Sequence, residues 1–202
     1  MHDINWRFSD KFRSHWIKVK FYKDKPSHQG IKPARNIRFC EATHKALLNP
    51  VLLNRKSMSC AGAQYAFGWN NGSKNQLLTK CNSKRKGQAN ISEAMFAQTV
   101  GLKETIEYIG LNTEGVPDMV LSYMPAEEVM EIIKMYYNST GRNLKMSLSP
   151  MMSICGGIAV RTYLKQDINL SFGCSDSRHY ADMRRETLAV GIPRKLFGIF
   201  VN

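Results

Sequence analysis

The sequence predicts an α+β fold, with one compact domain over residues 1–202 made of two similar αβ lobes, 16–100 and 115–202, and with the cysteines converging between them. Strand-like runs alternate with helix signals along the chain. The composition, 43% hydrophobic and 22% charged, is that of a globular domain. An internal echo adds to this: MSCAGA (58–63) and SICGGI (153–158) both place a cysteine and tiny residues at a predicted helix start. The echo suggests a diverged duplication, although chance similarity is the open alternative.

The first half contains short elements separated by polar loops. WIKVKFY alternates apolar and basic residues, as a half-buried strand does. CEATHKALL and the small-residue run after Cys60 predict helices, and Gly68 predicts the end of the second. The predicted elements here are strands at 16–22 and 50–54, helices from Cys40 and from Cys60, an exposed basic loop at 70–90 and a helix at 91–101.

The second half has more regular patterns. Pro125 at the start, two glutamates in the first turn and Gly141 beyond the end predict a helix over 125–141. DMVLSYM, LKMSLS and INLSFGC are typical of strands, and CGGIAVRTYL is typical of a helix. The other predicted elements are strands at 118–124, 144–149 and 168–174, with 168–174 ending at Cys174, and helices from Cys155 and from Pro193.

The net charge of +13 lies entirely in the first half. Residues 1–88 contain 18 Lys and Arg against 4 Asp and Glu, while residues 89–202 contain 11 against 12. This asymmetry favours an acidic partner, either nucleic acid or an acidic protein surface. The alternative is a basic face that contacts only solvent.

The sequence also gives expectations about location. No apolar run approaches the roughly 20 residues that span a bilayer, and the N-terminal segment lacks the apolar centre of a secretory signal. We therefore expect a cytoplasmic protein that does not bind membranes.

The cysteines are the strongest chemical signal. Their odd number in an expected cytoplasmic chain argues against a disulfide framework, and no pair has Cys-x-x-Cys spacing. All but Cys81 adjoin a predicted helix start or strand end beside small residues. The candidate metal ligands are therefore Cys40, Cys60, Cys155 and Cys174.

Four thiolates from separate segments suit an iron–sulfur cluster, here a [4Fe–4S] cluster, better than zinc, whose ligands usually come in close pairs. Small neighbours leave room for a cluster, and N–H groups at helix starts donate hydrogen bonds to its sulfurs. The alternative is a set of buried thiols without a ligand, since free cysteines are often buried.

Two further groups of residues have possible roles. Arg161 and Arg178 are candidates to clamp a small anionic ligand through bidentate contacts. Alternatively, these arginines pair with nearby acidic residues, namely Asp176, Asp182 or Glu186. His44, four residues after Cys40, makes a Cys–His nucleophilic pair conceivable, but a surface histidine is the simpler interpretation. Nucleotide-binding and serine-hydrolase motifs are absent from the sequence.

Several stretches resemble, in order, the segments of an uncharacterised prokaryotic family, domain of unknown function 169. They include RFCEATHKA, SMSCAGAQYAFG, ICGGIAVRTYL and INLSFGCSDSRHYADMRRETLAVGIP, and the similarity extends from about residue 16 to residue 198. Cys40, Cys60, Cys155 and Cys174 match the family, whereas Cys81 has no counterpart. The family is common in archaea and anaerobic bacteria, which implies oxygen-sensitive chemistry but supplies no function.

The sequence therefore predicts a cytoplasmic iron–sulfur protein that carries electrons or binds a small anion. Two alternatives from other classes stay open. One is a basic nucleic-acid-binding module that uses residues 1–88. The other is a structural subunit that docks on an acidic partner within a larger assembly.

Overall fold

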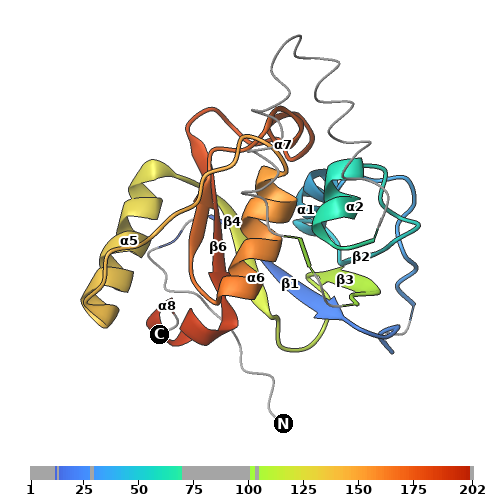
Figure 1. Ribbon diagram of the computed structural model, residues 1–202, viewed down its shortest axis with the longest axis horizontal. Helices are drawn as coiled ribbons and strands as arrows, with labels where there is room; N and C mark the ends of the chain where they lie inside the picture. Colours follow the sequence, from blue (N-terminus) through green and yellow to red (C-terminus); the bar gives the residue numbers. More distant parts are fainter. Residues whose placement is uncertain (1–11, 13, 28–29, 70–100, 103–104, 201–202) are drawn as a thin grey trace.

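The computed structural model describes residues 12, 14–27, 30–69, 101–102 and 105–200. This part of the chain has an α+β fold with a six-stranded antiparallel sheet (Figure 1). The strands are β1 (Trp16–Tyr22), β2 (Val51–Asn54), β3 (Tyr108–Leu111), β4 (Met119–Pro125), β5 (Asn169–Ser171) and β6 (Thr187–Pro193). The helices are α1 (Phe39–Ala46), α2 (Ala61–Ala66), α5 (Ala126–Thr140), η1 (Ser153–Val160), α6 (Arg161–Lys165), α7 (Ser175–Tyr180), η2 (Arg194–Leu196) and α8 (Phe197–Phe200).

The strand order of the sheet is β2-β3-β1-β4-β6-β5, and every pair is antiparallel. The first three strands therefore occupy one half of the sheet and the last three occupy the other. In each half the first strand pairs with the third, and the third pairs with the second. The two halves join where β1 pairs with β4, with Ile17 opposite Leu121 and Val19 opposite Met119.

Alternation of buried and partly exposed residues along β1 confirms the prediction for residues 16–22. Ile17, Val19 and Phe21 point into a core that also contains residues of α1, α2 and η1. A second core on the other side of β4 and β6 holds residues of α5 and α8. Figure 1 shows α1 and α2 at one end of the molecule, α5 at the opposite end and α6 between them. Helices thus cover both faces of the second half of the sheet.

Several helix predictions are confirmed to within one or two residues. α1 begins one residue before Cys40, and α2 begins directly after Cys60. Gly68 follows α2 with φ +70, the left-handed conformation that glycine adopts at little cost. In α5, Pro125 lies one residue before the helix and Gly141 ends it with φ 65. Strand predictions at 50–54 and 118–124 are also confirmed, by β2 and β4.

The prediction of a strand at 144–149 is wrong. The Asn169 side chain accepts a hydrogen bond from the Ser147 N–H at 3.0 Å and donates one to the Ser147 carbonyl at 3.2 Å. A side chain therefore satisfies the backbone groups that a strand would pair.

The predicted strand at 168–174 is too long. β5 ends at Ser171, because Gly173 turns the chain with φ +81, and Cys174 then precedes α7 instead of ending a strand. The sequence indicated only a turn where α7 lies.

Two strands escaped the sequence patterns. β3 is only four residues long, and β6 contains Gly191 and ends in Pro193, residues that disfavour strands. The helix expected from Pro193 is present as the short pieces η2 and α8, beginning at Arg194. The predicted loop at 70–90, which includes Cys81, lies outside the described residues, as does the predicted helix at 91–101 apart from Gly101, which is not helical.

Candidate functional site

Each of the four candidate cysteines lies at the beginning of a helix. Cys60 and Cys174 are the residues immediately before α2 and α7, both with extended backbone. Cys40 is the second residue of α1, and Cys155 is the third residue of η1. The first backbone N–H groups of a helix have no partner within it and carry the positive end of its dipole. All four thiols therefore stand beside groups that favour negative charge.

The helix that carries Cys155 has an unusual form. The predicted helix begins two residues earlier than expected, and its first part, η1, is a π-helix that continues into α6. Met152 precedes it with φ 49, and its carbonyl accepts hydrogen bonds from Gly156 at 2.8 Å and Gly157 at 3.0 Å. π-Helical segments are rare in proteins, but those that occur are often found at functional sites. This geometry singles out the Cys-Gly-Gly segment.

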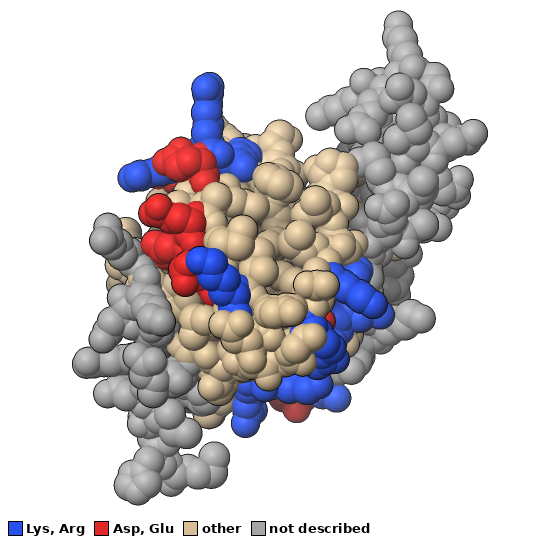
Figure 2. Space-filling view, turned by 90° about the vertical axis from the view of Figure 1, so that its left-hand side faces the viewer, with Lys and Arg blue, Asp and Glu red and all other residues tan. Residues whose placement is uncertain are grey.

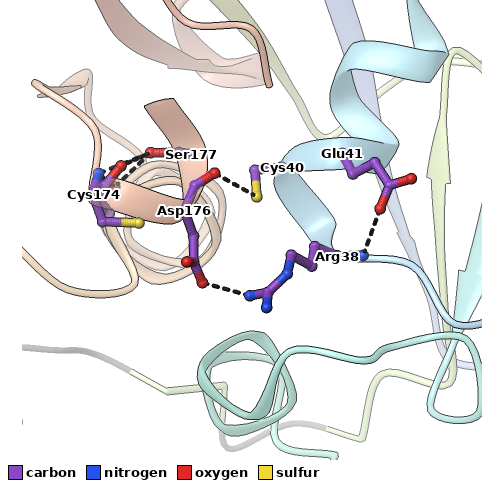
Figure 3. Close-up of polar contacts among 7 residues, drawn as sticks. Arg38, Cys40, Glu41, Cys174, Asp176 and Ser177 are labelled. Carbon is purple, nitrogen blue, oxygen red and sulfur yellow. Dashed lines mark hydrogen bonds and ion pairs between the residues drawn. The ribbon is translucent and has the colours of Figure 1, made fainter. Parts of the chain in front are cut away.

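Contacts connect Cys40 to the segment of Cys174. The Cys40 thiol donates a weak hydrogen bond to the backbone carbonyl of Asp176, with 3.8 Å between sulfur and oxygen. Figure 3 shows the Cys40 sulfur directed from α1 toward this carbonyl, which belongs to the first turn of α7. Asp176 is two residues after Cys174, so α1 and α7 meet at their cysteine-bearing ends.

A second set of hydrogen bonds connects Cys174 to the segment of Cys155. The Cys174 N–H donates to Ser153 Oγ at 2.6 Å and to Ser177 Oγ at 2.8 Å. Ser153 lies two residues before Cys155 and, like Ser177, is buried. The start of α7 is therefore held against the start of η1.

Close packing joins the segment of Cys60 to η1. A Cβ atom added at Gly62 would stand 2.9 Å from Met152 Cγ and 3.7 Å from Cys60 Sγ. Only glycine allows α2 to approach the residue that precedes η1 so closely. The small residues after Cys60, visible in the sequence, thus serve this contact.

Burial and neighbouring thiols shift the pKa of two cysteines upward. Desolvation raises the pKa of Cys40 to about 12, with further contributions from negative charge on Cys174 and Cys60. Desolvation likewise raises the pKa of Cys155 well above its ordinary value, and charge on Cys60, Cys174 and Cys40 adds to the effect. Both side chains are therefore neutral thiols near neutral pH when no metal is bound.

Cys174 differs from these two thiols. Desolvation by itself would raise the pKa of Cys174, but hydrogen bonds from Ser153 and Ser177 outweigh it and lower the pKa. Cys174 is thus biased toward the thiolate, the form that binds metals and reacts with electrophiles.

We predict that alkylation of the metal-free protein follows this order. At pH 8, iodoacetamide should modify Cys174 before Cys40 and Cys155, as measured by peptide mass spectrometry after short exposures. Because a pKa of about 12 lies far above this pH, the rate at Cys40 should rise about tenfold for each further pH unit, while the rate at Cys174 levels off. Equal rates at all three thiols, with the same pH dependence, would contradict these environments.

Tyr123 is a polar neighbour that the sequence did not reveal. It is half-buried on β4, and its hydroxyl shares a hydrogen bond of 2.8 Å with Thr43 Oγ1, which also contacts the Cys40 carbonyl at 2.7 Å. Desolvation raises the pKa of Tyr123, and charge on the nearby cysteines raises it further. The phenol therefore stays protonated beside the thiols.

Arg38 is a second residue that sequence reasoning missed. Its guanidinium forms an ion pair of 2.5 Å with Asp176 and stands 4.5 Å from the centre of the Tyr180 ring. The only sequence signal was a basic residue two positions before Cys40.

Arg161 and Arg178, the two arginines predicted to clamp a small anion, have different surroundings in the structure. Arg178 donates hydrogen bonds to the carbonyls of Arg184 and Thr187. Arg161 begins α6 and has no ion-pair partner in the described part of the chain. Neither arginine pairs with Asp176, which binds Arg38 instead, or with Asp182 or Glu186. Anion binding by Arg161 and Arg178 stays a prediction.

Two other observations concern the candidate ligands. His44, in the last turn of α1, forms no hydrogen bond with the Cys40 thiol, which is directed at Asp176. Among residues 12, 14–27, 30–69, 101–102 and 105–200, no three His, Cys, Asp or Glu side chains form a group that could hold a metal ion.

Surface charge is distributed in patches on the face seen in Figure 2, which is viewed from the α5 side. Acidic side chains gather toward its left edge, basic ones lie above them at the top and along the lower and lower-right edge, and most of the area between is uncharged. Exposed apolar side chains on α5 include Met130 and Tyr137.

Within the described residues no helix has the length and apolar character to span a membrane. The acidic-partner and nucleic-acid predictions for residues 1–88 stay open.

The fold and the cysteines define an α+β protein with four thiols at helix starts. The model of the uncharacterised ArCR family, domain of unknown function 169, matches residues 11–202. The chain therefore belongs to this family, as the resemblance of its cysteine segments predicted. No curated protein and no solved structure matches the chain.

Proposed function

We propose that this protein is a cytoplasmic iron–sulfur protein in which Cys40, Cys60, Cys155 and Cys174 converge on one [4Fe–4S] cluster. The observation that carries the proposal is the series of contacts between the cysteine-bearing segments. Cys40 forms a hydrogen bond with Asp176, Cys174 forms one with Ser153, and Gly62 packs on Met152. Each contact involves a residue no more than three positions from a candidate ligand.

The chemistry of the donor set supports this proposal. Four thiols are the usual ligands of such a cluster, and helix-start N–H groups can donate to its sulfurs. Cys174, biased toward the thiolate, is suited to bind iron first. Cys40 and Cys155 must lose protons on binding, because their pKa values are raised. Binding should therefore release protons and weaken as the pH falls.

We further propose that the domain consists of two similar lobes, and the repeated strand order supports this. Cys40 lies on a helix between the first and second strands of one half, and Cys155 lies between the corresponding strands of the other. Cys60 and Cys174 both precede the helix that follows the second strand. A duplication would thus have supplied two equivalent cysteine pairs. It would match Cys60 with Cys174, not with Cys155 as the sequence echo suggests.

Electron transfer is the activity that such a cluster supplies, and binding of a small anion near Arg161 or Arg178 is the alternative use. Zinc held by the same thiols is the competing cofactor, because tetrahedral zinc also takes four cysteines. Iron and zinc are distinguished by colour, since zinc–thiolate sites do not absorb visible light.

The test is purification without oxygen, followed by an absorption spectrum and assays of iron and acid-labile sulfide. We expect a brown protein with a broad shoulder at about 400 nm, which bleaches on reduction, and about four iron atoms and four sulfides per chain. A colourless protein that stays free of iron after incubation with ferrous iron and sulfide would contradict the proposal. Stoichiometric zinc would identify the competing cofactor.

A further inference from the structure

Two segments lie side by side at the β5 edge of the sheet. β5 is the last strand in the sheet order, and within the described residues its only strand partner is β6. The Ser147 backbone is bonded to the Asn169 side chain, and Ser153 accepts a hydrogen bond from the Cys174 N–H. The two segments that these bonds join therefore run next to each other in the same direction.

Three large apolar side chains on these two segments are exposed. Met146 and Leu148, on either side of Ser147, are 48% and 47% exposed, and Phe172, which directly follows β5, is 58% exposed. Apolar groups gathered on a surface and bordered by polar residues mark interaction sites, and Met and Phe are enriched at interfaces between proteins. We call Met146, Leu148 and Phe172 the β5-edge patch.

The β5-edge patch lies next to the thiol site. Phe172 is two residues before Cys174, and Leu148 belongs to the segment that continues to Cys155. Cys174 is partly exposed, whereas Cys155 is buried. A protein that covers Phe172 therefore approaches the proposed centre at one of its accessible thiols.

The charge around the β5-edge patch indicates what covers it. Residues 141–166 contain four Lys and Arg and no Asp or Glu. Arg142 and Lys145 are exposed just before Met146, and neither forms an ion pair within the described residues. Because the chain has a net charge of +13, a second copy would be repelled. The complementary occupant is acidic, and the apolar side chains favour a protein over nucleic acid, whose binding depends on phosphate contacts.

We propose that the β5-edge patch is the docking surface for an acidic electron-transfer protein, whose carboxylates face Arg142 and Lys145 and whose apolar centre covers Phe172. The inference rests on the proposed function for its purpose. One electron leaves the reduced cluster, which returns to its oxidised state, and reduces the centre of the partner by one electron. Docking itself requires no cluster in this chain. Redox encounters use small interfaces, so three apolar side chains with a basic border are an adequate surface.

The first arm of the test uses the metal-free protein. Its probe is a small bacterial two-cluster ferredoxin of strongly negative net charge, and binding is measured by surface plasmon resonance at low ionic strength. Phe172→Ala should weaken binding roughly 5- to 30-fold. Met130→Ala is the matched control, since Met130 is a half-exposed apolar residue on α5, and it should change binding by less than about 2-fold.

A pair of charge reversals separates docking at this surface from general attraction between opposite charges. Lys145→Glu should weaken binding roughly 3- to 10-fold and reduce its dependence on salt. Lys56→Glu makes the same change at an exposed lysine in the basic first half and should have a much smaller effect. Equal losses from the two reversals, a larger loss from Lys56→Glu, equal losses from Phe172→Ala and Met130→Ala, or no binding of the ferredoxin would overturn the inference.

Two other occupants are outcomes of the same experiment. Self-association that Phe172→Ala abolishes, measured by sedimentation, would assign the β5-edge patch to a second copy of the chain. Binding of a labelled single-stranded RNA that Phe172→Ala and Lys145→Glu weaken would assign it to nucleic acid. Either result would overturn an acidic protein as the occupant.

The second arm uses the cluster-loaded protein, reduced with dithionite and freed of excess reductant. On mixing with oxidised ferredoxin, the second-order rate of electron transfer should fall in Phe172→Ala by the same factor as binding, and should stay unchanged in Met130→Ala. An unchanged rate in Phe172→Ala would overturn the inference. Failure to load a cluster would instead contradict the proposed function, and the first arm would still decide whether the surface binds an acidic protein.

Discussion

Replacing Cys155 by alanine is expected to abolish cluster binding. Cys155 is buried and lies in the π-helical segment η1. With three thiolates left, one iron atom of a four-iron cluster would lack its protein ligand, and iron content after purification without oxygen should fall to a small fraction of the wild-type value. The measurement is iron and acid-labile sulfide per chain, together with the visible spectrum.

The matched control for this variant is Cys81→Ala. It removes a thiol from the same chain at the one cysteine outside the proposed ligand set, and it should retain the wild-type iron content. Thermal unfolding of both metal-free variants separates loss of a ligand from loss of the fold. Full iron content in folded Cys155→Ala protein, or equal losses in the two variants, would exclude Cys155 as a ligand.

Replacing Phe67 by alanine is expected to cause the largest loss of stability. Its side chain is 0% exposed, and its ring centroid lies 4.9 Å from that of Phe39 and 5.3 Å from that of Trp69. These contacts join α1 and α2 to the rest of the main core. Truncation should lower the free energy of unfolding by about 3–5 kcal/mol, and the melting temperature by roughly 6–20 °C for a chain of this size.

Phe172→Ala is the matched control for Phe67→Ala. Phe172 is the same residue type but is 58% exposed, so its truncation should change the unfolding free energy by no more than about 0.5 kcal/mol. The comparison is made by denaturant unfolding of the metal-free protein. Equal destabilisation by the two substitutions would contradict the central position of Phe67 in the core.

Sequence patterns predicted the elements whose signals are local. A few adjacent residues sufficed to predict β1 from its alternation, the end of α2 from the glycine that follows it, and both ends of α5. The structure confirms each of these predictions. β3 and β6 were missed because their stability comes from pairing with strands distant in sequence, which offsets the unfavourable short length of β3 and the glycine in β6. The strand prediction for residues 144–149 was wrong for the opposite reason. The local alternation favoured a strand, but the Asn169 side chain forms hydrogen bonds with backbone groups that would otherwise pair with a neighbouring strand.

The candidate site divides in the same way. Cysteines beside small residues were visible in the sequence, and the positions of Cys40 and Cys60 at helix starts followed from local patterns. Ser153, Tyr123 and Arg38 were not predicted, because each makes its contact with a residue distant in sequence, namely Cys174, Thr43 and Asp176 respectively. The sequence similarity between the segments of Cys60 and Cys155 joins residues that occupy different places in the topology. The residue that occupies the place of Cys60 in the second half is Cys174, and this was missed because α7 was not predicted.

Iron X-ray absorption spectroscopy of the loaded protein tests the proposed centre most directly, because it reports the atoms bound to iron. We predict sulfur alone in the first shell and iron in the second, in wild-type and Cys81→Ala protein alike. A first shell containing nitrogen or oxygen, or sulfur ligation without a neighbouring iron, would contradict a four-iron cluster held by these four cysteines.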